Sequence, residues 1–153
     1  MDQLKEQAEK TYRAIGRFIF EFSQTEYTIR KGLEIVLGLD QKFFDPVIQS
    51  YDVALLCKVT KHAVRSSRSS ETAEQIDKLI NRFFAMNETR QRVAHGLWVP
   101  HFSGGKVSHV SRQKLAAVMH SDQTEALEKK STELGETRDK LWFAFNALEE
   151  PSG

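Results

Sequence analysis

Apolar residues recur at intervals of three or four positions along four stretches of the chain, and this spacing predicts four helices. Asp45 followed by Pro46 has the form of an N-cap and a first helical residue, and Ser70 is a second candidate N-cap. Gly96 is expected to end the third helix in a left-handed conformation. The predicted helices span 2–37, 46–66, Ser70 to Gly96, and 122–148.

The spacing of apolar residues changes from helical to alternating after Gly96. Residues 98–102 and 107–110 alternate, and Gly104-Gly105 between them predicts the two-residue turn of a β-hairpin. Pro100 restricts this hairpin to the edge of a small sheet, because proline lacks the N–H that a central strand must donate.

These patterns define the expected fold class as all-α. We expect a four-helix bundle with a short β-hairpin inserted before the last helix, in one domain over 1–150 with a frayed end at 151–153. No apolar run approaches the ~20 residues of a membrane span, and the first residues lack an export pattern. The lone Cys57 fits a reducing cytoplasm and is expected to be a small buried group rather than a nucleophile.

His101 and His109 in the expected hairpin are candidate metal ligands. In the expected register His101 faces Ser108 and His109 faces Pro100, which places the two imidazoles on opposite faces. With one cysteine and no His-x-x-His or Cys-x-x-Cys spacing, the sequence predicts no metal site and no cofactor. These histidines are interpreted as surface or RNA-contacting groups.

A polar cluster replaces the apolar residues at the end of the third predicted helix. At ~100° per residue, Asn87, Arg90 and Ala94 share the azimuth of the apolar residues before them. Polar groups in such a position must be paired, hydrated or in contact with a ligand. Asn87 has two interpretations: it satisfies backbone groups at a helix end, or it helps to hold a functional site.

Glu26 is the polar exception in the first helix, because it lies at the centre of the apolar stripe between Phe22 and Ile29. A buried carboxylate needs a cation or a proton, and Arg90 is the expected partner. The pair is either purely structural or one in which the carboxylate orients a catalytic arginine.

The net charge of +1 conceals an uneven distribution. Residues 53–114 hold eleven Lys and Arg against four Asp and Glu, a net charge of +7, whereas 1–52 and 115–153 carry −2 and −4. Such a positive segment suits an anionic ligand, although uneven surface charge explains it equally well. Basic residues also continue the second helix, where they either hold phosphates or cover a solvated helix end. The candidate RNA-binding residues are Lys58, Lys61, Arg65 and Arg92.

The segment Arg90-Gln91-x-x-x-His95 resembles the Arg-polar-x3-His signature of HEPN domains, a family of small helical proteins that includes RNA-cleaving toxins and defence nucleases. Val93-Ala94-His95-Gly96 and Phe22-Ser23-x-x-Glu26 are also similar to that family, whereas Gln91 stands where the family usually has Asn, Asp or His. The resemblance implies a symmetric homodimer that cleaves RNA without a metal, and an antitoxin or regulatory protein as partner. The candidate catalytic residues are Arg90, His95, Glu26 and Asn87.

The chemistry of RNA cleavage fits these residue types. The 2′-hydroxyl is an internal nucleophile, so the protein must move a proton, as an imidazole does near neutral pH, and must stabilise phosphate charge, as a guanidinium does. Five residues along a helix place Arg90 and His95 ~140° apart, however. Either the helix unwinds before His95, or a second copy of the chain completes the site.

Two other classes of function remain open. One is a HEPN-like module that binds RNA or nucleotide, or dimerises a partner, without cleaving. The other is a helical adaptor or immunity protein in which Glu26, Asn87 and Arg90 form a structural polar network. RNA cleavage by the wild type and by a His95→Ala variant separates the nuclease from the other two, and salt-sensitive RNA binding separates the module from the adaptor.

Overall fold

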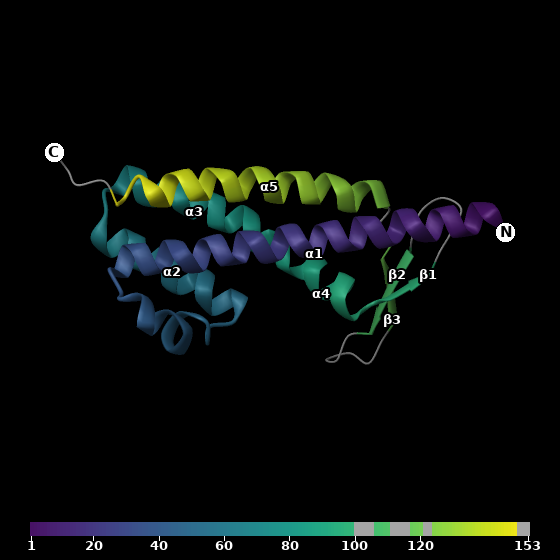
Figure 1. The fold of residues 1–153 in the computed structure, drawn as a ribbon, viewed down its shortest axis with the longest axis horizontal. Coiled ribbons are helices and arrows are strands. Elements are labelled where there is room, and N and C mark those ends of the chain that lie inside the picture. Colours follow the sequence, from purple (N-terminus) through teal and green to yellow (C-terminus); the bar gives the residue numbers. More distant parts are fainter. Residues whose placement is uncertain (100–105, 111–116, 121–123, 150–153) are drawn as a thin grey trace. The chain divides into compact units, whose positions relative to one another are not determined.

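The computed structural model describes residues 1–99, 106–110, 117–120 and 124–149 (Figure 1). Over these residues the chain is mainly helical, which supports the all-α class in its coarse form, with five α-helices where four were expected. The helices are α1 (Asp2–Leu37), α2 (Val53–Ser67), α3 (Ser70–Ala85), α4 (Asn87–His95) and α5 (Thr124–Asn146). A 3₁₀ turn, η1 (Gln41–Phe43), and a π turn, η2 (Phe44–Ile48), precede α2.

The chain divides into two compact units. One consists of Met1–Phe22 and Met86–Glu133, and the other of Ser23–Ala85 and Leu134–Gly153. The first half of α1, all of α4 and the start of α5 therefore belong to the first unit, whereas α2 and α3 belong to the second.

The first helix has the predicted bounds, because its apolar residues keep helical spacing over ten turns' length without a competing stop signal. It ends at Gly38, whose φ of +61° is the left-handed conformation that glycine adopts without steric cost. Among the side chains that it buries are Thr11, Ala14, Phe18, Phe22, Thr25, Ile29 and Leu33.

Glycine at position 32 lets α1 approach α5 closely within the second unit. A Cβ atom added to Gly32 would collide with the ring of Phe145, which is itself 1% exposed. The hydroxyl of Thr25 also donates a hydrogen bond to the carbonyl of Leu134 at 3.3 Å. Small residues on this side of α1 are therefore a packing requirement.

The predicted start of the second helix at Asp45-Pro46 is wrong. Asp45 and Pro46 lie within η2, and α2 begins only at Val53. The carboxylate of Asp52 accepts from the backbone N–H of Leu55 at 2.8 Å. The spacing of apolar residues would also place Leu55 on the buried face of this helix, but Leu55 is exposed. Instead, α2 buries Val53, Leu56, Cys57, Thr60 and Val64.

Three short strands follow α4 and form an antiparallel sheet in the order β1-β2-β3. They are β1 (Leu97–Val99), β2 (Lys106–Val110) and β3 (Ala117–His120). The expected pairing of His101 with Ser108 is wrong, because Ser108 pairs with Leu97. The prediction considered only a Gly-Gly turn, whereas β2 pairs with strands on both of its edges. Pro100, His101, Gly104 and Gly105 lie outside the described residues.

None of the helices in the described ranges combines the length and the apolarity needed to cross a membrane.

Candidate functional site

The helix α4 carries most of the candidate residues, and it is separate from α3 because the chain turns at Met86. Within α4, Thr89 and Val93 are buried, whereas Ala94 is exposed. The prediction that Ala94 continues the buried stripe is therefore wrong. Gly96 is extended (φ −80°, ψ 157°), which also corrects the expected left-handed stop.

Arg90 lies over an aromatic ring of α1. Its guanidinium carbon is 5.5 Å from the centroid of the Phe22 ring, which is a favourable position for a cation–π interaction. Phe22 is 3% exposed and packs against Phe18, with 6.3 Å between the ring centroids. The ring thus gives the guanidinium a rigid support without neutralising its charge.

Asn87 opens α4 with an unsatisfied acceptor. Its carboxamide oxygen is buried and has no hydrogen-bond partner among the residues that the structure describes. A buried acceptor without a donor costs about 1–3 kcal/mol. A donor from a ligand or from another protein chain would relieve this cost.

Arg92 is held on the protein surface by its own helix. It pairs with Glu88 at 3.1 Å and donates to the hydroxyl of Thr89 at 3.3 Å, and its side chain is only 14% exposed. Lys130 of α5 donates to the same hydroxyl at 3.0 Å. Lys130 adds a cation to this part of the first unit, and no signal in the sequence connected it with α4.

His95 is exposed at the last position of α4. The backbone N–H of Gly96 donates to the carbonyl of Arg92 at 2.8 Å, so the helical hydrogen-bond pattern extends past His95. The helix therefore does not unwind before His95, and the ~140° between Arg90 and His95 persists. Of the two arrangements considered for a shared phosphate, the one in which the helix unwinds before His95 is therefore wrong.

Glu26 has a different partner from the expected Arg90. Its carboxylate accepts from Arg30, one turn further along α1, at 2.9 Å. Arg30 is 8% exposed and also donates to the carbonyls of Ile48 and Tyr51, at 2.6 and 2.8 Å. A glutamate four residues before an arginine is a stabilising helical pair, and here it anchors the connection between α1 and α2.

Two of the basic residues of α2 bind side chains of α3. Lys61 donates to the amide oxygen of Asn81 at 3.0 Å, and Arg65 forms an ion pair with Asp77. These contacts join the two helices. Lys58 is exposed and has no hydrogen bond or ion pair with the described part of the chain.

Burial raises the pKa of the Cys57 thiol to about 12, with nearby Lys61 acting in the opposite direction. Such a thiol is protonated and unreactive at neutral pH. Across the described ranges, no three His, Cys, Asp or Glu side chains gather as metal ligands would.

Comparisons with protein-family models, with curated proteins and with solved structures found no match for this chain.

Proposed function

We propose that the chain is a metal-independent endoribonuclease of the HEPN type. The observation that carries the proposal is the placement of two groups on one helix: an arginine supported by an aromatic ring, and an exposed histidine five residues later. The candidate role of Arg90 is to clamp a phosphate, and that of His95 is to transfer a proton. A toxin or defence role, with a neutralising protein partner, follows from the resemblance to that family.

The proposed reaction uses the RNA as its own nucleophile. His95 takes the proton of the 2′-hydroxyl, and O2′ attacks the adjacent phosphorus while the bond to the 5′-oxygen breaks. A second imidazole or water protonates the departing oxygen. The products are a 2′,3′-cyclic phosphate and a 5′-hydroxyl, and Arg90 stabilises the charge on the phosphate oxygens through its paired N–H donors.

A symmetric homodimer is part of this proposal. Because Arg90 and His95 point ~140° apart on α4, the Arg90 of one copy and the His95 of the other would share a phosphate. The unsatisfied oxygen of Asn87 is available to a donor from the second copy. A two-fold axis beside α4 would also double the local positive charge.

The alternative function is an RNA-binding module that does not cleave. If the chain is a monomer, the ~140° between Arg90 and His95 favours this alternative, because the two side chains could not share a phosphate. In that case the cations of α4 would bind phosphates without chemistry, and affinity would fall steeply with salt.

Cleavage of a labelled RNA in the presence of EDTA tests the proposal. The wild type should cleave RNA, spare the matching DNA and leave a cyclic phosphate, and His95→Ala should lose ~10²–10⁴-fold in rate. His62→Ala is the matched control, since His62 is an equally exposed histidine on α2. Equal cleavage by His95→Ala and wild type would refute the assignment, and salt-sensitive binding without cleavage would establish the alternative.

A further inference from the structure

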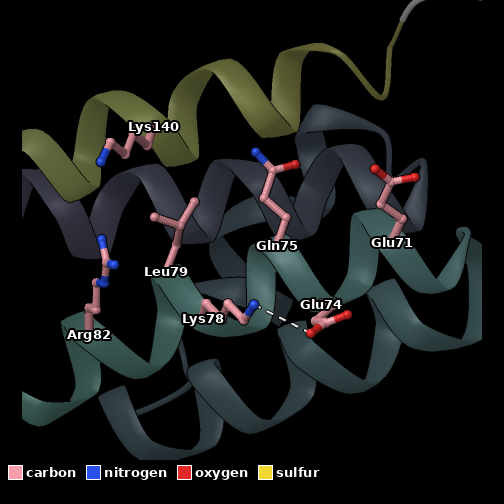
Figure 2. A pocket seen from close by; sticks show the side chains of 7 residues that line it. All are labelled: Glu71, Glu74, Gln75, Lys78, Leu79, Arg82 and Lys140. Atoms are coloured by element: carbon pink, nitrogen blue, oxygen red, sulfur yellow. Dashed lines mark ion pairs between the residues drawn. The ribbon is translucent and has the colours of Figure 1, made fainter.

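A groove between α3 and α5 of the second unit is lined by cations at one end (Figure 2). Its volume is about 540 Å³, which is within the ~300–1,000 Å³ of small-molecule sites. Figure 2 shows Lys140 extending from α5 and Arg82 from α3 toward each other across it. The residues that line it are Glu71, Glu74, Gln75, Lys78, Leu79, Arg82 and Lys140.

The charges of the groove are separated along α3. Glu74 is paired with Lys78 at 3.3 Å. Glu71 lies eleven residues before Arg82, roughly 16 Å along the helix axis, which is about twice the screening length of ~8 Å at physiological salt. The carboxylates that line the groove therefore leave Arg82 and Lys140 unneutralised.

Neither Arg82 nor Lys140 has an ion pair or hydrogen bond with any residue that the structure describes. Both are exposed, and Lys140 faces Arg82 from another helix (Figure 2). Two facing cations repel one another, and an anion that bridges them would remove this repulsion.

We propose that this end of the groove binds a phosphate monoester, with Arg82 and Lys140 as its two main ligands. A planar guanidinium donates two parallel hydrogen bonds to a phosphate, and an ammonium adds a third donor from the opposite side. Leu79, 5% exposed, forms an apolar part of the wall beside them.

The end of the groove at Glu71 is acidic, and this determines which kind of phosphate ligand the groove can hold. A strand of nucleic acid lying along the groove would place a further phosphate beside Glu71, where like charges repel. A single terminal phosphate avoids that contact. The site is therefore specific for a phosphate at the end of a molecule, either a free nucleotide or the 5′ end of a strand.

This site is independent of the proposed ribonuclease activity, since its residues belong to the second unit and α4 to the first. Isothermal titration with inorganic phosphate and adenosine 5′-monophosphate tests it, with adenosine as the uncharged probe. Saturable binding of the first two and none of adenosine is expected. DNA oligonucleotides with and without a 5′-phosphate extend the test without being substrates for 2′-hydroxyl attack.

The variants Arg82→Gln and Lys140→Gln should each weaken binding on the order of tenfold, as loss of a charge-assisted hydrogen bond implies. Lys129→Gln on α5 is the matched control, because Lys129 is exposed and does not line the groove. An equal loss in Lys129→Gln, binding of adenosine, or no saturable binding of phosphate would overturn the site. Tighter binding of the 5′-phosphorylated strand than of the nucleotide would assign the ligand to strand ends, and the reverse to free nucleotides.

Wild-type protein provides a second measurement that does not depend on a variant folding. Backbone amide shifts on adding phosphate should concentrate in α3 near Arg82 and in α5 near Lys140. Shifts confined to Lys58 and its neighbours on α2 would contradict the assignment.

Discussion

The guanidinium of Arg90 is supported by the face of the Phe22 ring, with 5.5 Å from its central carbon to the ring centroid. An ion pair with Glu26, which the sequence had favoured, would have occupied the donors that a phosphate needs. The ring contacts the guanidinium and leaves its charge intact. This arrangement suits an arginine that binds a ligand better than one that only stabilises the fold.

We therefore expect Arg90→Lys to lose RNA cleavage although it keeps the charge, because an ammonium cannot reproduce the planar fork. Arg92→Lys is the control on the same helix, since Arg92 is already paired with Glu88. Rates of RNA cleavage and thermal unfolding measured together separate the two roles. Cleavage by Arg90→Lys at the wild-type rate would show that the fork is not required.

The most demanding structural role among the charged residues belongs to Arg30. It binds Glu26 and the carbonyls of Ile48 and Tyr51 in a site where it is 8% exposed. Arg30→Met would leave a carboxylate and two carbonyls without their donor, and we expect a loss of about 3–5 kcal/mol in the free energy of unfolding.

Lys10→Met is the matched control for Arg30→Met. Lys10 pairs with Glu6 at the same spacing on α1, but both side chains are more than half exposed. Chemical denaturation should detect little change in this variant, because water replaces an exposed pair. A loss equal to that of Arg30→Met would contradict the role assigned to burial.

Local sequence patterns predicted the ends of a helix correctly where only one capping or spacing signal was present. The apolar spacing predicted both ends of α1, and the Glu26–Arg30 pair could have been predicted from its four-residue spacing. The start of α2 could not, because Asp45-Pro46 and Asp52 offer competing caps. The choice depends on Arg30, which binds carbonyls about twenty residues away.

The candidate site, too, could be predicted only in part from the sequence. The residue types of Arg90 and His95 were evident from the sequence, as was their divergence on a helix. Their surroundings were not, since α4 buries Thr89 and Val93 and exposes Ala94. The support from Phe22 and the contact of Lys130 with Thr89 depend on packing between distant segments.

Gly32→Ala should destabilise the protein by about 1–3 kcal/mol, because its new methyl group would overlap the ring of Phe145. Gly16→Ala provides an opposite control on the same helix. Nothing lies within 4 Å of a Cβ atom at Gly16, so alanine there should stabilise by up to ~1 kcal/mol through helix propensity. If urea denaturation shows that both variants change the free energy of unfolding in the same direction, this account is refuted.

Cys57 should make the fold sensitive to alkaline pH. Its pKa rises from 9.0 to about 12 on burial, so the folded state keeps a proton that the unfolded state releases first. The contribution of this pKa difference to the free energy of unfolding is fully present below pH 9. It is lost as the pH rises from 9 toward 12. Cys57→Ala should therefore show a shallower fall in the free energy of unfolding over that range, and parallel curves would contradict the assignment.

Mixing two inactive variants tests whether one copy supplies Arg90 and the other His95. In a heterodimer of Arg90→Ala with His95→Ala, one of the two shared sites would have both residues and the other would have neither. Random exchange makes about half of the dimers mixed, so about a quarter of the wild-type activity should return. Each variant alone should stay inactive at the same total concentration. Native mass spectrometry of variants carrying tags of different mass shows whether the dimers exchange. If they exchange and mixing restores nothing, each site would have to be built within one chain. The ~140° between the two side chains would then argue for binding without cleavage.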